Sequence, residues 1–406
     1  MFGLFNKTIR IILKLWNISL SVVYGDLIAY NSYSRFITRF ERRFADYIGC
    51  KYGLTFCNGT STIEAAIFAL GIKEDDEVLV PSYTFHSSIF PVIAIGAKPI
   101  FVDIDETTLT MDAEDLRKKT TDKTRCIVVV HLWGNSAEMD KICAIAKEHN
   151  LKIIEDCSHA HGTAWKGKKV GSIGDIGCFS LQGKKPISAG EGGIAVTNDR
   201  HLYERMSLYG HFGRIKDELQ HTQYKCLLPV GVGYKRNANP LGICMAIVDL
   251  KYIDRINRNK QKVAEKIEKI IDDIEGVSAV KSYSEVQKGG FYNGFPIVID
   301  KKTAEFISLE KLIEQLKHYG ISAKKNHYEL YHMFLHLSDL EYRKNILYNT
   351  DNHQIKTPEN SIVLPVTENT FNRVCFLPLN EHITNRQLKH LRKSLQNILN
   401  VAKNKT

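Results

Sequence analysis

The chain has 406 residues, of which 44% are hydrophobic and 25% charged, as is typical of a soluble globular protein with about two domains. Lys and Arg exceed Asp and Glu by 55 to 45, so the formal net charge is +10. These basic residues are spread along the sequence without a nucleic-acid-binding signature, so they suit anionic small molecules and not nucleic acid. Nine scattered cysteines, none spaced C-x-x-C, argue against a disulfide framework or a cysteine zinc site and favour a reducing cytoplasm.

Residues 1–24 mix apolar side chains with Lys7, Arg10 and Lys14. Lys14 interrupts the apolar run and no small-residue cleavage site follows, so the pattern differs from that of a signal peptide. It is also too short and too charged for a membrane-spanning helix. We treat 1–30 as a separate N-terminal segment with two open interpretations. It is either a helix docked on the protein or on a partner subunit, which is the commoner case, or an amphipathic helix in weak contact with a membrane surface.

The next elements predict an anion site. Apolar residues three and four apart predict a helix over 36–48, and a short strand is expected at 53–56. Gly59, Thr60 and Ser61 follow this strand and begin a second helix. Amides and hydroxyls at such a helix start can bind an anion, although Thr60 or Ser61 could instead simply cap the helix. Three hydroxyls in a row beside a glycine are more than capping requires.

Buried strands then alternate with helices as far as residue 155. The apolar runs near 78–81, 99–105, 126–131 and 152–155 are nearly continuous, which is typical of a parallel sheet covered on both faces. Functional residues are expected at the carboxyl ends of such strands.

Asp156, His159 and His161 follow the last of these strands, and three interpretations stay open. The three side chains could bind a metal ion, but no further ligand cluster supports this, and we predict no metal site. Asp156 could cap the next turn. Alternatively, Asp156 could pair with a protonated ring nitrogen of a cofactor, with His159 stacked near the same ring.

The stretch from Cys178 to Asp199 carries Ser180, the adjacent Lys184 and Lys185, and a glycine-rich turn at 190–193. A lysine held between a short strand and such a turn can be fixed and partly desolvated, which lowers its pKa and suits covalent amine catalysis. A surface hairpin with both lysines in water is the alternative, and the stretch alone does not decide between them.

Downstream, loops at 209–214 and 231–240 precede a helix that begins after Pro240 and ends near Ile274. We place the domain boundary inside this helix, with a large domain at 31–255 and a small domain at 256–406. The small domain is expected to contain strands at 295–300 and 321–325, helices at 308–318 and 384–400, and an irregular region at 326–360.

Taken together, four motifs resemble the DegT/StrS family of sugar aminotransferases, which are pyridoxal 5′-phosphate (PLP) enzymes of fold type I. These motifs are N-G-T-S before a helix, V-P-S-Y-T-F, E-D-C-S-H-A-H-G, and F-S-x-x-x-x-K with G-E-G-G downstream. They occur in the family's order over about residues 33–399. The resemblance implies an α/β fold: a large PLP-binding domain, with a mixed, mostly parallel sheet sandwiched by helices, and a smaller C-terminal α+β domain.

The resemblance also implies roles for individual residues. Lys185, and not Lys184, matches the Schiff-base lysine and proton shuttle, and Asp156 matches the carboxylate at the pyridinium nitrogen. His159 and Phe85 match groups on the two faces of the cofactor ring. The phosphate cradle matches Gly59, Thr60, Ser61 and Ser180. Lys235 stands where the family commonly has an Asn that reaches the partner's phosphate, so this assignment departs from the pattern. Substrate contacts are expected from His211, His327 and Tyr328.

The function implied is the conversion of a nucleotide-linked keto sugar, at C3 or C4, to an amino sugar with L-glutamate as donor. Surface polysaccharide or amino-sugar biosynthesis in the cytoplasm is the expected setting, and a homodimer with shared active sites the expected assembly. Alternatives are a cyclitol or aminoshikimate-type aminotransferase, a dehydratase of the same family, or a non-catalytic PLP- or sugar-binding regulator. The dehydratases carry a histidine at the lysine position, so Lys185 favours transamination.

Overall fold

The computed structural model describes residues 34–211, 214, 219–228, 230–326, 328–333 and 362–403. The predicted N-terminal segment 1–30 and most of the region 326–360 lie outside these residues. Within the described part of the chain, no helix is both long enough and apolar enough to cross a membrane.

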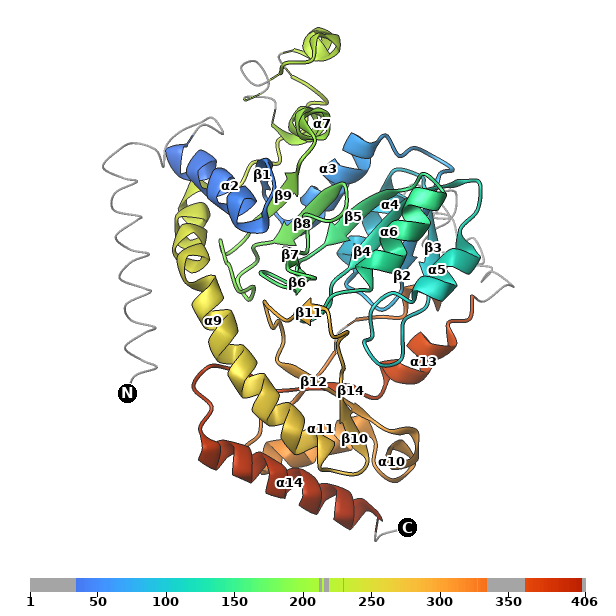
Figure 1. The fold of residues 1–406 in the computed structure, drawn as a ribbon, viewed down its shortest axis with the longest axis vertical. Helices are drawn as coiled ribbons and strands as arrows, with labels where there is room; N and C mark the ends of the chain where they lie inside the picture. The colour runs from blue at the N-terminus through green and yellow to red at the C-terminus, as the bar shows by residue number, and fades with distance from the viewer. Residues whose placement is uncertain are drawn as a thin grey trace, which may run out of the picture.

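The larger part of the molecule is built on a seven-stranded sheet in the order β1-β9-β8-β5-β4-β2-β3 (Figure 1). Its strands are β1 (Tyr52–Phe56), β2 (Glu77–Pro81), β3 (Lys98–Val102), β4 (Thr124–Val130), β5 (Lys152–Asp156), β8 (Ile176–Ser180) and β9 (Gly193–Thr197). β9 runs antiparallel to both β1 and β8, whereas the other neighbours are parallel. The strands are nearly continuous apolar runs because both faces of this sheet are buried.

Helices cover both faces of the sheet. One face packs against α3 (Gly59–Leu70), α4 (Phe90–Ala94) and α7 (Arg200–Gly210). The other face packs against α5 (Ala113–Lys119), α6 (Met139–Glu148), α2 (Arg35–Ile48) and the first half of α9 (Pro240–Asp272). Strand β4 shows the alternation, because Cys126 and Val128 face the first layer while Ile127 and Val129 face the second.

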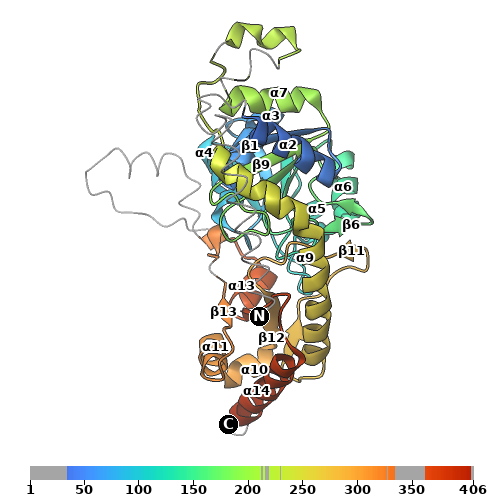
Figure 2. The ribbon, with the colours of Figure 1, turned by 90° about the vertical axis from the view of Figure 1, so that its left-hand side faces the viewer.

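The smaller part is an antiparallel sheet in the order β10-β12-β14-β13, and Figures 1 and 2 show it beyond the far end of α9. Its strands are β10 (Val277–Ala279), β12 (Phe295–Ile299), β13 (Lys324–Lys325) and β14 (Val374–Leu377). The second half of α9 shares an apolar core with α11 (Leu309–His318) and α14 (Asn385–Lys403). The remaining short helices are α10 (Lys301–Phe306), α13 (Pro365–Phe371), η1 (His86–Ser88), η2 (Thr222–Leu227) and η3 (Tyr331–Met333).

A third, small sheet joins the chain after α9 to the large sheet. It contains β11 (Val286–Gln287), β6 (Ala164–Trp165) and β7 (Lys168–Lys169). Immediately after β11 the backbone comes very close to the large domain, since a Cβ added to Gly134 would lie 2.4 Å from the carbonyl oxygen of Gly289. This contact directs the segment 289–294 toward the carboxyl edge of the large sheet.

The predicted fold class is confirmed: a mixed, mostly parallel sheet between helices, followed by a smaller C-terminal α+β unit. Element bounds differ slightly, since the first described helix begins at Arg35 and α9 ends at Asp272. The strand expected at 321–325 is reduced to Lys324–Lys325. The proposed domain boundary after residue 255 falls inside α9, and the division into 31–255 and 256–406 stays a prediction.

Candidate active site

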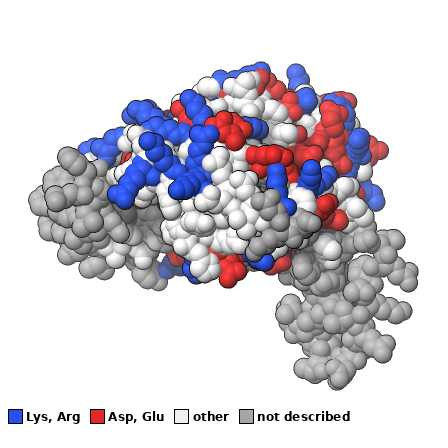
Figure 3. Space-filling view, turned by 90° about the horizontal axis from the view of Figure 1, so that it is seen from below, with Lys and Arg blue, Asp and Glu red and all other residues white. Residues whose placement is uncertain are grey.

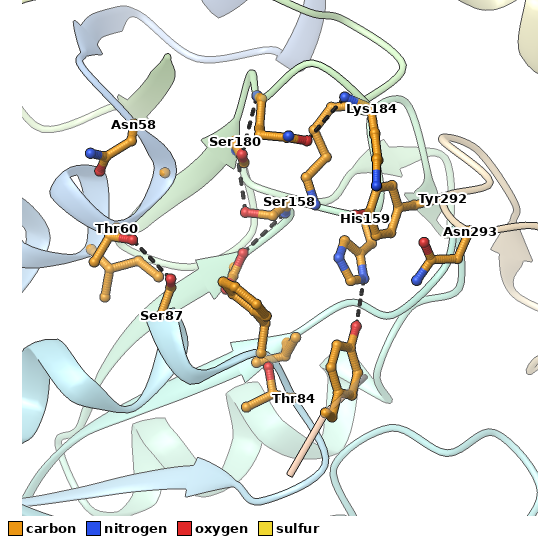
Figure 4. A pocket seen from close by; sticks show the side chains of 18 of the residues that line it. Asn58, Thr60, Thr84, Ser87, Ser158, His159, Ser180, Lys184, Tyr292 and Asn293 are labelled. Atoms are coloured by element: carbon orange, nitrogen blue, oxygen red, sulfur yellow. Dashed lines mark hydrogen bonds between the residues drawn. The ribbon is translucent and has the colours of Figure 1, made fainter. Parts of the chain in front are cut away.

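A cavity opens at the carboxyl ends of β4, β5 and β8 (Figure 4). Its walls come from the ends of these strands, the start of α3, the segment after β2, the turn after β8 and two segments of the small domain. The strand ends contribute Val130, Asp156 and Ser180, and the small domain contributes Tyr292, Asn293 and Tyr328. This is the edge at which parallel strands are expected to collect functional side chains.

Lys185 lies in the turn after β8 and is partly buried in this cavity. Its backbone N–H donates to the carbonyl oxygen of Gln182 at 2.8 Å, which fixes the turn. Its Nζ lies 3.7 Å from the ring centroid of Tyr292. Burial lowers the pKa of Lys185 to about 8, an effect that the negative charge of Asp156 partly opposes. An amine with this pKa is partly neutral near physiological pH, as a nucleophile requires.

Lys184 also borders the cavity, but its side chain is exposed. Its backbone N–H bonds the side-chain oxygen of Gln182 at 3.0 Å. The surface-hairpin interpretation therefore describes Lys184 and not Lys185.

Asp156 ends β5 and is buried at the floor of the cavity. One carboxylate oxygen accepts the Ser88 hydroxyl at 2.7 Å, and the other accepts the backbone N–H of Ser158 at 3.0 Å. The Ser88 oxygen lies 3.0 Å from the Thr84 hydroxyl, so a short polar chain orients the carboxylate. Each carboxylate oxygen can accept more than one hydrogen bond, so Asp156 can also face a protonated ring nitrogen.

His159 is held between two tyrosines from the small domain. Its ring stacks on that of Tyr292, with centroids 4.2 Å apart and planes 23° apart. Its Nδ1 lies 3.2 Å from the hydroxyl of Tyr328 (Figure 4). The imidazole therefore has a fixed plane at the wall of the cavity, as a group that stacks against a cofactor needs.

The start of α3 supplies an anion-binding end. Asn58 caps this helix by accepting the Ser61 N–H at 2.8 Å, and Thr60 donates to the Ser87 hydroxyl at 2.8 Å. A Cβ added to Gly59 would lie 2.8 Å from Cβ of Ser180, so only glycine lets the helix start approach that strand end. Backbone amides and hydroxyls at a helix N-terminus suit a phosphate. The residues present thus fit PLP: an amine, a buried carboxylate and a phosphate cradle in one cavity.

Phe85 also lines the cavity, and its ring is 44% exposed. It packs on the ring of His86, with centroids 4.0 Å apart. An exposed aromatic face is free to stack on a ligand ring.

Three predicted residues do not line the described cavity. The Ser61 hydroxyl is buried and lies 3.4 Å from the Cys57 sulfur. His211 is buried against Phe56, with ring centroids 5.0 Å apart. Lys235 is exposed and pairs by a backbone bridge with His211. His327 lies outside the described residues. The cofactor role of Lys235 was predicted for the partner's site, and it stays a prediction.

The metal interpretation of Asp156, His159 and His161 gains no support. His161 is fully buried between Phe44 and Phe179, and burial lowers its pKa to about 3, with the nearby Lys185 charge adding to the effect. Among the described residues, the group with metal-binding spacing is instead His131, Glu155 and Cys157.

That group already has a structural role. Glu155 is fully buried and accepts the backbone N–H groups of Gly171, Ile173 and Gly174 at 2.7–2.8 Å. It also bonds Nε2 of His131 at 3.1 Å. We interpret Glu155 as the anchor of the turn before β8.

The sequence analysis assigned no role to several residues of the cavity, above all Tyr292 and Asn293. Both follow a glycine pair, and Phe291 and Asn293 have positive φ values of 44° and 68°. The Nδ2 of Asn293 is buried without a hydrogen-bond partner among the described residues, so it can donate to a ligand. The motif G-G-F-Y-N-G at 289–294 was the available signal, because glycine-rich segments permit close backbone approach.

Comparisons with known proteins agree with this geometry. The DegT/DnrJ/EryC1/StrS aminotransferase family matches residues 29–396. GDP-perosamine synthase of Escherichia coli O157:H7 is 37% identical over 275 residues, 68% of this chain and 72% of that protein. The dTDP-3-amino-3,6-dideoxy-alpha-D-galactopyranose transaminase of Aneurinibacillus thermoaerophilus is 37% identical over 226 residues, 55% of this chain and 60% of that protein.

Among solved structures, an aminotransferase from Psychrobacter cryohalolentis superposes with a TM-score of 0.79 at 26% identity, covering 96% of this chain and 97% of that one. The fold is that of PLP enzymes of fold type I. The chain therefore belongs to the DegT/DnrJ/EryC1/StrS aminotransferase family and is a PLP-dependent aminotransferase.

Proposed function

We propose that this aminotransferase converts the keto group of a nucleotide-linked sugar, at C3 or C4, into an amine, with L-glutamate as the amino donor. The names of two relatives, a GDP-perosamine synthase and a dTDP-amino-dideoxygalactose transaminase, support a nucleotide-linked amino sugar as the product. The observation that carries the proposal is the partly buried amine of Lys185, with its pKa lowered to about 8, in one cavity with Asp156 and Ser180.

Lys185 has two tasks in this proposal. Its Nζ holds the cofactor covalently in the resting enzyme. Once the amino donor has displaced it, the free amine takes a proton from the donor carbon and delivers it elsewhere on the same face. When bound, PLP supplies an electron sink that makes this carbon-bound proton acidic. An amine with a pKa near 8 can both accept and release a proton at neutral pH, which is what a shuttle requires.

Asp156 keeps the ring nitrogen of the cofactor protonated. A buried carboxylate close to a protonated nitrogen favours the charged form of that nitrogen. The Ser88 hydroxyl and the Ser158 N–H hold the carboxylate in place, so its orientation does not depend on the cofactor. His159 and Phe85 contact the ring from its two sides, and Gly59, Thr60 and Ser180 receive the phosphate.

Asn293 and Tyr292 come from the small domain and lie beside Lys185, on the side open to a substrate. We assign to the Asn293 amide a hydrogen bond to the donor or the sugar, because its Nδ2 is a buried donor without a partner in the described part of the chain. We also propose a homodimer with shared active sites, in which Lys235 reaches the partner's cofactor phosphate as a point charge.

A dehydratase is the nearest alternative within the family, and Lys185 argues against it, since that reaction dispenses with the lysine. A cyclitol or aminoshikimate-type keto acceptor, or a binding protein without catalysis, remains for experiment to separate. The purified enzyme should be incubated with L-glutamate or L-glutamine and a panel of nucleotide-linked 3-keto and 4-keto sugars.

Amine formation is then followed by mass, and 2-oxoglutarate by a coupled assay. The proposal predicts a glutamate-dependent replacement of oxygen by an amine on a nucleotide-linked sugar, lost in Lys185→Ala and kept in Lys184→Ala. Amination of cyclitols alone would assign the enzyme to the other acceptor class. Cofactor binding without any amination across both panels would instead favour the regulator.

A further inference from the structure

The exposed side of α9 carries a row of basic residues at helical spacing. We call it the basic stripe: Lys251, Arg255, Arg258, Lys262, Lys266 and Lys269, all of them exposed. Successive members are three or four residues apart, so at 3.6 residues per turn they fall within about 80° of the helix circumference. With a rise of 1.5 Å per residue, the stripe is about 27 Å long.

Two neighbouring helices extend the stripe into a broader basic face. α2 adds the exposed Arg35, Arg39, Arg42 and Arg43, and α14 adds the exposed Arg386, Lys389, Arg392 and Lys393. α14 contains no Asp or Glu. The three helices are in contact, through a hydrogen bond of 2.8 Å from Tyr47 to Asp254 and one of 3.3 Å from Lys266 to Asn385.

The figures show that this charge lies on one side of the molecule. In Figure 2, α2, α9 and α14 are together on the side turned to the viewer. In Figure 3, Lys and Arg gather on the side where α9 lies, whereas Asp and Glu are concentrated on the other side. The net charge of +10 is thus distributed unevenly over the surface.

The charges of the stripe are not neutralised by nearby carboxylates. Among the described residues, none of its six side chains forms an ion pair within 4.0 Å, although Arg392 of α14 pairs with Asp273 at 3.0 Å. Asp254 and Glu265 also lie on α9, where they accept hydrogen bonds from Tyr47 and Gln261. None of the stripe residues lines the active-site cavity, so transamination does not account for them.

We propose that the basic face of α2, α9 and α14 docks this enzyme on an anionic phospholipid membrane. A row about 27 Å long, widened by two further helices, matches an extended anionic surface better than a small anion. The described chain begins at α2, so the preceding segment joins the protein at this face. That segment mixes apolar residues with Lys7, Arg10 and Lys14, a composition suited to the membrane interface.

The test is sedimentation of the full-length enzyme with vesicles of phosphatidylcholine alone or mixed with phosphatidylglycerol. Each Lys or Arg near an anionic surface strengthens binding about fivefold. The triple variant Arg255→Glu, Arg258→Glu and Lys262→Glu should therefore bind mixed vesicles at least about 100-fold more weakly. The matched control is Lys118→Glu, Lys123→Glu and Lys147→Glu, which makes the same charge change at exposed sites on the α5–α6 side.

The proposal expects binding of the wild type to mixed vesicles but not to phosphatidylcholine, loss of that binding at high salt, and near-normal binding of the control triple. Both triples should retain the wild-type transaminase rate, which shows that they fold. Failure of the wild type to bind mixed vesicles overturns the proposal. So does equal weakening by both triples, because net charge alone would then be responsible. Salt-sensitive binding to RNA without binding to vesicles would assign the face to a different partner.

Discussion

The contact between Lys185 and Tyr292 gives a prediction that can be worked out in detail. The Nζ lies 3.7 Å from the Tyr292 ring centroid, and a ring face attracts the charged form of an amine by about 0.5–2 kcal/mol. That energy corresponds to roughly 0.4–1.5 pH units. Tyr292→Leu keeps an apolar cover over the lysine but removes the ring face. The pKa of Lys185, lowered by burial to about 8, should therefore fall further, to about 7. Tyr292→Phe keeps the ring and should leave this pKa unchanged.

The assay is competitive acetylation of the cofactor-free protein at a series of pH values, with the labelled fraction of Lys185 measured by peptide mass. The midpoint of its reactivity should shift downward in Tyr292→Leu only. An unchanged or higher midpoint in Tyr292→Leu would refute the assigned role of the ring. An equal shift in Tyr292→Phe would assign the effect to the hydroxyl. Because the cofactor is absent from the assay, loss of the stacking on His159 does not confuse the result.

Three further predictions concern the support of the site. Tyr328→Phe removes the hydroxyl 3.2 Å from Nδ1 of His159, so kcat should fall about two- to tenfold with the sugar KM little changed; a large KM change would instead support the predicted substrate contact. Glu155→Gln places an amide before three backbone donors and His131, and should lower the free energy of unfolding by about 3–5 kcal/mol, measured by urea denaturation. His161 has a pKa lowered to about 3, so the native state stays neutral while the unfolded chain binds a proton below about 6.5. Stability should therefore fall as the pH drops, by about 2 kcal/mol at pH 5 from this residue, and His161→Gln should show a smaller loss.

Much of the large domain could be predicted because its strands are buried on both faces. Continuous apolar runs indicated a parallel sheet, and the edge rule for such sheets placed Asp156 and Ser180 together. The choice of Lys185 over Lys184 came from the family resemblance, and the burial of Lys185 agrees with it. Within Gly59-Thr60-Ser61, successive helical side chains point about 100° apart. Thr60 therefore reaches the cavity while Ser61 turns toward Cys57.

What the sequence left out depends on long-range packing. Tyr292 and Asn293 reach the cavity because α9 leads the chain away and the contact of Gly289 with Gly134 brings it back. No local pattern encodes that return. Similarly, His159 and His161 are equivalent by type and spacing, and only the packing of Phe44 and Phe179 buries one of them. The basic stripe was visible as a sequence spacing, but its significance required the exposed face of α9.

The central claim is that Lys185 is the residue that holds the cofactor. The most direct measurement is borohydride reduction of the PLP-loaded enzyme, followed by peptide mass mapping of the segment that contains Lys184 and Lys185. We predict a reduced pyridoxyl phosphate adduct on Lys185, absent in Lys185→Ala and retained in Lys184→Ala. An adduct on Lys184, or a labelled Lys185→Ala variant that remains active, would contradict the account.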